Sequence, residues 1–559
     1  MKIIISILFI SVLVLPGCGA EFASDNSMSP ESDHGWGGSG GGGGSEWDYD
    51  VYPGAASDAA SSADYGPPPV AETEFNFNLN APQASENYVY IAATQRDSLV
   101  RINADESLEI RLIPVGGQPT TVATLATDDV ALVINRGTQD FSIVRSSDAT
   151  DEVTTVNMLP NVNSIRVSPD DKYALVYYNE EAAADNEPVG DFQTIAIVNM
   201  VDGKEKVRTI STGFHITTIY FDRSKPVAYL VTDDGVAILD LKNADDGSIT
   251  PLVAVTDNPI EDPAMREVLV TEDGSYAVVR HLAKAHIRIV ELNSGTLATV
   301  DVAGLPTDVD LIPGADAALL VLREQKKAYV VDLVAALEAV LEDDEDKQDD
   351  AIAEIDITGS QAGAAVVTKD GTRAVLYTTV GEVKAVTMMD LTLSDYPLQT
   401  FQVQKSVVGV DVSEGGNNAI VFHDIEAFPA DAGNLEKTIA QSHGFTLFDL
   451  DTGYRKLIQT NHKWSQHLFI AKEPGIDLKA YVLTPDPAQM AHKVQEIDLT
   501  TYIVSPLPIA SRPLSMVYVP ASRKVAVSQD HLNGRITFVD VDSGETYSVT
   551  GYELNGLIH

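Results

Sequence analysis

A strand–turn–strand unit recurs along most of this 559-residue chain and constrains its fold more than any other feature. In each unit an apolar strand leads into a turn, often Asp-Gly or Asp-Asp, and a second apolar strand follows. Because Asp and Gly tolerate the positive φ angles of tight turns, this pattern predicts β-hairpins. Copies lie at 165–178 (IRVSPDDKYALVYY), 268–279 (VLVTEDGSYAVV), 365–376 (AVVTKDGTRAVL) and 516–527 (MVYVPASRKVAV).

Two more strands complete each unit. The third often ends in Asp or Glu before a turn with Gly, as at 287–295, 445–453 and 536–544. The fourth follows that turn, as at 297–302 and 454–458. Each unit is therefore expected to be a small four-stranded antiparallel sheet, which cannot bury both of its faces alone and must stack against its neighbours.

We count ten units from the first residues of their second strands, which lie 41 to 61 residues apart. Those residues are Tyr88, Val130, Tyr173, Val227, Tyr276, Ala317, Arg373, Asn418, Lys479 and Lys524. Four short strands in every 40–50 residues are typical of β-propeller blades. Stacked helical repeats are excluded, because the apolar period is two throughout. The prediction is an all-β propeller of about ten four-stranded blade-like repeats.

The repeat resembles the YVTN and lactonase-like propeller repeats of bacteria. The matching residues are Pro169 to Tyr173 (PDDKY), Asp273 to Tyr276 (DGSY), Ala480 to Val482 (AYV) and the third-strand residues Asp240, Asp498 and Asp540. The resemblance covers about 72–559, and it implies a propeller in a family whose members commonly have seven blades. Lactone hydrolysis would also follow from it, but no catalytic residue of that family matches a position here.

The closure of the ring is left partly open by the sequence. Most propellers have 4–8 blades, so ten in one ring would be large. One continuous ring is favoured because no linker-like break divides the repeats; two packed smaller rings, or a smaller ring with irregular units, are the alternatives. Phe75 to Leu79 is a candidate innermost strand for the first blade, and Tyr552 to Ile558 a candidate edge strand.

The only cysteine, Cys18, follows a short apolar run from Ile3 to Leu15. That run is too short for a membrane-spanning helix, which needs about 20 residues, and fits a signal peptide. Gly17 before the cysteine resembles a bacterial lipoprotein signal, which predicts lipidation of Cys18 and removal of residues 1–17; an ordinary secretory signal is the alternative. Gly19 after the cysteine favours the outer membrane or cell surface of a Gram-negative bacterium.

Residues 18–71 are expected to form a lipidated, disordered tether ahead of the propeller domain at 72–559. They are rich in Gly, Ser, Ala and Pro, and such residues bury too little apolar area to offset chain entropy. A flexible chain of this length would reach about 40 Å. The domain boundaries are therefore 1–17, 18–71 and 72–559.

Charge and composition exclude some classes of partner. The net charge is −45 at pH 7, which argues against nucleic acid, because nucleic-acid binding needs faces rich in Lys and Arg. Without a second cysteine no intramolecular disulfide can form. Residues 332–341 have helical composition, with Val334, Leu337 and Leu341 on one predicted apolar stripe. The acidic run at 342–350 lacks the spacing of a calcium loop, so no metal site is predicted.

Longer loops are expected on one face of the propeller. In this architecture the loops between second and third strands and the crossings between blades open on the same face, which by analogy of fold is the commoner binding side. The insertions there are 179–192, 257–266, 425–444, 461–466 and 485–493. Long loops on a rigid scaffold often carry binding residues.

Eight polar residues near the ends of second strands are candidate ligand-binding residues. Arg136, Arg280 and Arg323 occupy related positions and could ring an anionic ligand, a peptide or a carbohydrate. Histidines and their acidic neighbours could approach the ring axis from different blades. These are His281, His423, Asp424, Asp530 and His531.

No pattern in the sequence supports nucleophilic catalysis or a cofactor. A Gly-x-Ser-x-Gly elbow and a phosphate-binding loop are both absent. The leading hypothesis is therefore a monomeric, lipid-anchored envelope propeller that binds a protein, peptide or carbohydrate through loops on one face, rather than an enzyme. A lactonase-type hydrolase and a divalent-cation-binding envelope subunit are the alternatives.

Overall fold

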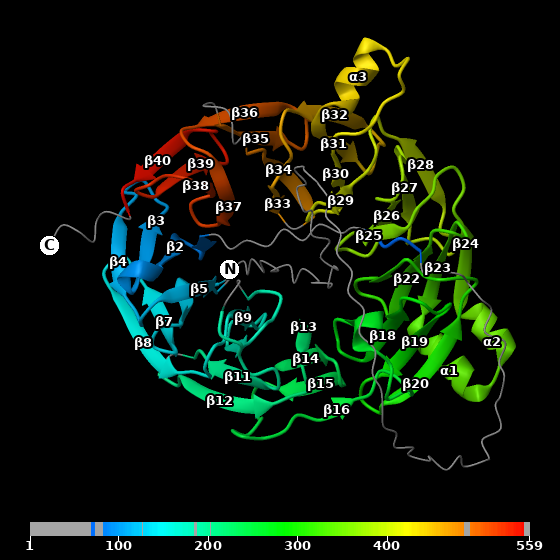
Figure 1. Ribbon diagram of the computed structural model, residues 1–559, viewed down its shortest axis with the longest axis horizontal. Coiled ribbons are helices and arrows are strands. Elements are labelled where there is room, and N and C mark those ends of the chain that lie inside the picture. The colour runs from blue at the N-terminus through cyan, green and yellow to red at the C-terminus, as the bar shows by residue number, and fades with distance from the viewer. Residues whose placement is uncertain are drawn as a thin grey trace, which may run out of the picture. The chain divides into compact units, whose positions relative to one another are not determined.

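A computed structural model describes residues 69–72 and 82–552, with gaps at 126, 184–186, 202, 474 and 486–491. Within this part, each set of four consecutive strands forms one antiparallel sheet, and ten such sheets follow one another. Figure 1 shows them as the blades of one ring, with first strands toward the axis and fourth strands at the rim. The predicted all-β fold and ten-bladed ring are confirmed, and the alternatives with smaller or paired rings are wrong. Residues 1–68 lie outside the described residues.

The blades are numbered in chain order. Blades 1 to 3 contain β1 (Gln83–Ala84), β2 (Tyr88–Ala93), β3 (Ser98–Asn103), β4 (Ile110–Pro114), β5 (Pro119–Thr124), β6 (Val130–Asn135), β7 (Asp140–Ser146), β8 (Asp151–Asn157), β9 (Ser164–Val167), β10 (Tyr173–Tyr177), β11 (Thr194–Asn199) and β12 (Lys206–Ser211). Blades 4 to 6 contain β13 (Ile216–Phe221), β14 (Val227–Thr232), β15 (Gly235–Asp240), β16 (Leu252–Val253), β17 (Arg266–Val270), β18 (Tyr276–His281), β19 (His286–Glu291), β20 (Thr296–Asp301), β21 (Asp308–Leu311), β22 (Ala317–Leu322), β23 (Lys327–Asp332) and β24 (Ile352–Asp356). Blades 7 to 10 contain β25 (Ala364–Val367), β26 (Arg373–Tyr377), β27 (Ala385–Asp390), β28 (Leu398–Gln402), β29 (Gly409–Val412), β30 (Asn418–His423), β31 (His443–Asp449), β32 (Arg455–Thr460), β33 (Gln466–Glu473), β34 (Ile476–Leu483), β35 (His492–Asp498), β36 (Val504–Ile509), β37 (Pro513–Val519), β38 (Lys524–Gln529), β39 (Arg535–Asp540) and β40 (Thr546–Thr550).

The second strands begin where the sequence predicts in every blade but the ninth. There β34 begins at Ile476 rather than Lys479, because the hairpin with β33 is longer. Its pairing continues through two irregularities to Glu473 opposite Ile476. The repeat motif lies in the regular part of that hairpin, so it marks Lys479 and not the true strand start.

In blades 3, 5 and 7 the turn between first and second strands is closed by a Ser or Thr and an Asp two positions later. In blade 3, Ser168 Oγ donates to Asp170 Oδ1 at 2.7 Å and accepts the backbone N–H of Tyr173 at 3.0 Å. Thr271 with Asp273 and Thr368 with Asp370 repeat the arrangement in blades 5 and 7. The Asp-containing turns of the sequence repeat thus satisfy backbone donors that the hairpin leaves unpaired.

The Asp that ends many third strands has a similar role. Asp449 Oδ1 accepts the backbone N–H groups of Asp451 at 2.9 Å and Thr452 at 2.8 Å, and Gly453 adopts a positive φ of 73°. The same Asx turn follows Asp240, Asp498 and Asp540. These aspartates, which carry part of the sequence resemblance, are therefore explained by turn structure.

The core of the described ring consists of separate apolar layers between blades. Ten clusters of buried side chains are present in the described part, one for each pair of neighbouring blades. A typical layer joins Val176 and Val198 of blade 3 to Leu132 and Ile143 of blade 2. Since each sheet buries both faces against neighbours, the ring is stabilised only when all the blades are present.

The ring closes by packing rather than by a shared strand. Blade 1 holds only strands from the start of the described region, and blade 10 only strands from its end. Phe538 and Tyr552 pack with Val89 and Ile102 across the joint, and Lys524 Nζ donates to the carbonyl of Ala104 at 2.8 Å. This answers the question that the sequence left open.

The candidate closing strands of the sequence lie largely outside the described residues. The segment from Phe75 to Leu79 is outside the described residues, and the innermost position of blade 1 is occupied by β1. Of the stretch from Tyr552 to Ile558, only Tyr552 is described, and its ring is buried at the joint.

Helices occur only in the connections among the described residues. They are α1 (Leu333–Glu342), α2 (Glu345–Asp350), α3 (Asn434–Ala440) and the 3-10 turns η1 (Thr94–Arg96) and η2 (Pro263–Met265). The predicted helix after Asp332 is confirmed, but its buried side chains include Leu333, Ala336 and Leu337, whereas Leu341 is 57% exposed. The buried face differs from the predicted stripe because Leu333, Ala336 and Leu337 are the side chains that pack into the apolar layer between blades 5 and 6. Within the described residues, we find no helix with the length and apolar character needed to cross a bilayer.

Candidate functional site: the loop face of the ring

The loops between second and third strands and the crossings between blades define what we call the loop face. The predicted insertions lie mainly in these connections, and four of them extend one or two residues into the next strand. The connections are 178–193 from β10 to β11, 254–265 from β16 to β17, 424–442 from β30 to β31, 461–465 from β32 to β33, and 484–491 from β34 to β35. Parts of the first and last of these loops lie outside the described residues.

Each of the three candidate arginines is bound to a carboxylate of its own chain. Arg136 pairs with Glu187, with one N–H···O distance of 2.7 Å. Arg280 Nε donates to Glu267 Oε2 at 2.6 Å, and one guanidinium nitrogen of Arg323 donates to Glu72 Oε1 at 2.8 Å. The anionic ligands expected for these arginines are therefore supplied internally, on blades 2, 5 and 6, rather than by one shared anion.

Glu267 and Arg280 belong to a buried group that also includes Asp308, the first residue of β21. Burial raises the pKa of Asp308 to about 6, although Arg280 acts in the opposite direction. Asp308 Oδ2 accepts the backbone N–H of Ala365 at 2.6 Å and so connects blade 6 to blade 7. The sequence analysis missed Asp308 and Glu267; the only signal was an acidic residue inside an apolar innermost strand.

His423 is fully buried at the end of β30, and both of its ring nitrogens are bonded. Nδ1 lies 2.9 Å from the carbonyl oxygen of Ser406, and Nε2 lies 2.7 Å from Oγ1 of Thr446. Nδ1 therefore carries the proton, because a carbonyl can only accept. Burial lowers the pKa of His423 to about 4, so the ring is neutral at physiological pH and holds three parts of blade 8 together.

Asp424, the next residue, points into an ion-pair group instead. Its carboxylate lies 2.8 Å from Nδ1 of His443 and 3.0 Å from Nζ of Lys463. Although partial burial opposes it, the hydrogen bond from Lys463 keeps the pKa of Asp424 below its usual range. His423 and Asp424 are therefore neighbours in sequence but occupy different surroundings.

The remaining candidate histidines support local turns. His281 Nδ1 accepts the backbone N–H of Ala283 at 3.0 Å, and His531 Nδ1 accepts that of Asn533 at 3.2 Å. Asp530 is exposed, and its backbone N–H donates to the carbonyl of Arg512. The structure does not bring these residues together with His423. In the described part of the chain, no three His, Cys, Asp or Glu side chains are arranged to hold a metal ion.

The most elaborate element of the loop face is the blade 8 arm, residues 425–441, which carries α3 and projects from the rim of the ring in Figure 1. Its stem is fixed by Lys405, whose side chain is fully buried and whose Nζ donates to the carbonyls of Ile439 at 2.7 Å and Ala440 at 3.3 Å. A cation at the C-terminal carbonyls of a helix is electrostatically favourable.

The other end of the arm is held by Glu426. Its carboxylate lies 2.6 Å from Nζ of Lys384 and accepts the backbone N–H of Ser406 at 2.9 Å. Between these anchors Leu435 is 76% exposed, and Ile425, just before Glu426, is 56% exposed. The arm therefore presents apolar side chains from a stem that is fixed to the ring.

A second part of the loop face is aromatic. In the long loop of blade 3, Phe192 packs edge-on against Tyr178, with ring centroids 5.2 Å apart. Phe214, on the crossing into blade 4, lies 5.4 Å from Phe192 and is 43% exposed. This loop is thus ordered against the ring by aromatic contacts, and it leaves one phenylalanine open to solvent.

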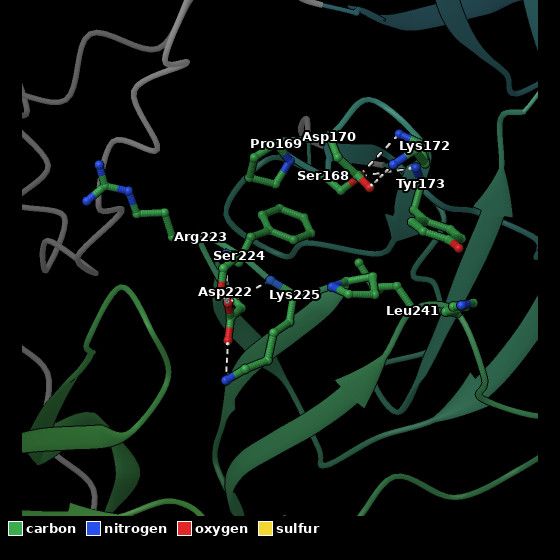
Figure 2. Close-up of a pocket in the computed structure, with 13 residues that line it drawn as sticks. Ser168, Pro169, Asp170, Lys172, Tyr173, Asp222, Arg223, Ser224, Lys225 and Leu241 are labelled. Atoms are coloured by element: carbon green, nitrogen blue, oxygen red, sulfur yellow. Dashed lines mark hydrogen bonds and ion pairs between the residues drawn. The ribbon is translucent and has the colours of Figure 1, made fainter. Parts of the chain in front are cut away.

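The opposite face carries a pocket of about 460 Å³ between blades 3 and 4 (Figure 2). Its walls include hairpin turns in which two lysines pair locally: Lys172 Nζ lies 3.0 Å from Asp170 Oδ2, and Lys225 Nζ lies 3.3 Å from Asp222 Oδ2. Figure 2 shows Arg223 pointing away from the other labelled residues, and it pairs with Glu272 at 3.1 Å. These pairs stabilise the turns that line the groove.

Comparison with known proteins gives no family for this chain. No family model matches the chain, and no curated protein matches it. Among solved structures, a eukaryotic initiation factor shares 10% identity at a TM-score of 0.44, over 84% of this chain and 96% of its own. The dihydro-heme d1 dehydrogenase NirN shares 11% sequence identity at a TM-score of 0.39, over 83% of this chain and 73% of its own. Hydrazine synthase from Kuenenia stuttgartiensis shares 15% sequence identity at a TM-score of 0.28, over 60% of this chain and 99% of its own.

All three TM-scores are below 0.5 and all three identities are 15% or lower, so these similarities support no conclusion about this chain. The β-propeller fold rests instead on the ring of ten four-stranded sheets in the described residues. The resemblance to YVTN and lactonase-like repeats continues to rest on the motif residues alone.

Proposed function

We propose that this protein is an exported, lipid-anchored β-propeller that binds a protein partner at the bacterial envelope through its loop face. Export and anchoring are supported by the apolar run before Cys18 and by the tether composition of residues 19–71. The acidic net charge of −45 favours neither nucleic acid nor anionic lipid surfaces as partners.

The observation that carries the proposal is the fixed stem of the blade 8 arm. A buried lysine is costly unless its charge is satisfied, and the ammonium of Lys405 donates hydrogen bonds to the carbonyls of the arm's last helical turn. An arm that is ordered in advance loses less entropy on binding. Its exposed Leu435 and Ile425 provide apolar contact area of the kind found at the centres of protein interfaces.

The test compares two single substitutions at exposed leucines. Leu435→Asp places a charge on the arm, whereas Leu341→Asp places the same charge on α1, outside the loop face, where Leu341 is 57% exposed. In a first experiment, a photo-crosslinking residue at position 435 should yield one discrete adduct in envelope preparations, which identifies the partner. In a second experiment without the crosslinker, we expect Leu435→Asp to weaken pull-down of that partner at least tenfold and Leu341→Asp to leave it unchanged. Equal capture by both variants, or no discrete adduct, would refute the arm as the docking element.

The anchor is tested separately. Cys18→Ser removes the only thiol of the chain, so the variant should leave the membrane fraction and appear in the soluble fraction. Metabolic labelling with a fatty-acid probe should mark the wild-type chain and not the variant. Retention of the variant in the membrane fraction would contradict lipid anchoring while leaving the role of the arm open to its own test.

A further inference from the structure

A short segment before the first blade, residues 69–72, is bound to the far side of the ring. Glu72 Oε1 accepts hydrogen bonds from Arg323 and from Oγ1 of Thr378, both at 2.8 Å. Glu72 Oε2 accepts from the backbone N–H and from Oγ1 of Thr379, both at 2.7 Å. The segment is the short blue stretch beside β25 in Figure 1.

Every group that faces this carboxylate is a donor. A guanidinium, two hydroxyls and a backbone N–H together satisfy both oxygens of an ionised carboxylate, which can only accept. With the segment in place Arg323 is 2% exposed and Thr378 is fully buried, so these two donors lie in the interior of the site, while Thr379 is partly buried. We call the group formed by Arg323, Thr378, Thr379 and Gly363 the carboxylate socket.

Gly363 provides the space for the ligand. A Cβ atom at this position would lie 1.8 Å from Glu72 Oε1 and 3.0 Å from Cδ of Arg323. Any other residue at 363 would therefore fill the place of the carboxylate. The glycine lies in the crossing from blade 6 to blade 7, on the loop face, opposite the turn that carries Arg323.

The segment is bound as a ligand would be, through few atoms. Apart from the Glu72 carboxylate, Val70 contributes its carbonyl, which accepts from Arg323 at 2.8 Å, while its side chain is 69% exposed. Glu72 belongs to no strand, and the blade that follows it in sequence lies across the ring from blades 6 and 7 (Figure 1). The socket is thus complete without any contribution from the segment to the fold of a blade.

We propose that the carboxylate socket is a recognition site for a glutamate side chain in an extended peptide, and that Glu72 is its resident ligand. The inference depends on the contacts of Glu72 and not on the proposed role of the blade 8 arm. Covalent connection gives Glu72 an effective concentration of about millimolar, so a free acidic peptide competes poorly until Glu72 is removed.

The test uses the full chain with Glu72→Ala and a fluorescent peptide that copies residues 67–74 (PPPVAETE). Fluorescence anisotropy should show saturable binding to the variant and at least tenfold weaker binding to the wild type. A matched peptide with Gln in place of the third-last residue, the copy of Glu72, should bind at least tenfold more weakly than the parent peptide. Adding Gly363→Ala to Glu72→Ala should abolish binding, because its methyl group occupies the place of the carboxylate.

A second double variant, Glu72→Ala with Arg323→Met, should also lose the peptide. Cooperative thermal melting shows which variants are folded. If Arg323→Met unfolds the ring, the double variant with Gly363→Ala still tests the socket. The proposal is overturned if folded Glu72→Ala does not bind at millimolar peptide, if the Gln peptide binds equally, or if Gly363→Ala leaves binding unchanged. None of these outcomes affects the crosslinking result at position 435.

Discussion

Asp477 of blade 9 completes the turn that Gly415 leaves unfinished in blade 8. In blades 3, 5 and 7 the residue two positions after the turn Ser or Thr is an Asp, but in blade 8 that position is Gly415. Asp477 Oδ1 accepts the backbone N–H of Gly415 at 2.9 Å, and its Oδ2 accepts from Ser413 and, at 2.8 Å, from Asn418. One carboxylate therefore closes a hairpin and joins two blades.

Asp477→Ala should destabilise the protein by about 1–3 kcal/mol, because three donors of blade 8 lose a charged acceptor. Gly415→Asp should destabilise the wild type, since a Cβ at 415 would lie 2.8 Å from Asp477 Oδ1. In the Asp477→Ala background the same Gly415→Asp should instead restore stability, because it supplies the carboxylate found in the other blades.

Chemical denaturation of the two single variants and the double variant measures this coupling as a double-mutant cycle. The free energies of unfolding are expected to be strongly non-additive, with the double variant more stable than either single variant. Additive losses would show that Asp477 does not replace the missing turn residue.

Acid should weaken blade 8 through His423. The pKa of His423 is about 4 in the folded protein and about 6.5 in an unfolded chain, so the folded state binds fewer protons between these values. The contribution of His423 to the free energy of unfolding is therefore fully present above pH 6.5. It falls as the pH drops toward 4 and does not change further below that pH. The expected loss is up to about 3 kcal/mol.

His423→Gln should flatten that part of the pH profile, whatever its effect at neutral pH. The measurement is the free energy of unfolding at pH 7.0, 5.5 and 4.5 for the wild type and the variant. An identical slope in both proteins would assign the acid sensitivity to other groups.

Lys405→Met should loosen the blade 8 arm and leave the ring nearly intact. The ammonium of Lys405 is bonded to the last carbonyls of α3, and a neutral side chain of similar size cannot replace those bonds, which are worth about 1–3 kcal/mol. Hydrogen exchange of residues 425–441 should accelerate at least tenfold, with other blades unchanged. Lys437→Met, on α3 itself, is the matched control and should preserve protection; unchanged exchange in Lys405→Met would mean that the stem is held elsewhere.

The ring should tolerate circular permutation between blades. Because the joint of blades 1 and 10 has no shared strand, a chain opened in the crossing 302–307 and joined from 552 to 82 by a short linker keeps every blade whole. We expect its free energy of unfolding to change by less than about 2 kcal/mol. Opening the chain inside β22, between Leu319 and Leu320, should prevent folding, since both residues are fully buried. Failure of the first permutant would show that chain order contributes to closure.

The sequence by itself determined the blade pattern. Apolar alternation with a period of two, and turns built on residues such as Asp170 and Asp449, are local features, because an Asx turn bonds to backbone groups two or three residues away. The starts of the second strands could be predicted for the same reason. The exception is β34, which begins at Ile476 rather than at the predicted Lys479, because irregular pairing extends its hairpin.

Only the tertiary structure decided which charged groups meet. Arg323 and Glu72 are separated by 251 positions, and Asp477 and Gly415 by 62, so no local pattern links them. His423 and Asp424 are adjacent in sequence, yet one is buried with both nitrogens bonded and the other joins an ion-pair group, because β30 ends at His423 and Asp424 begins the loop that follows. Packing of one blade on the next determines what each side chain contacts, and that information lies in the assembled ring.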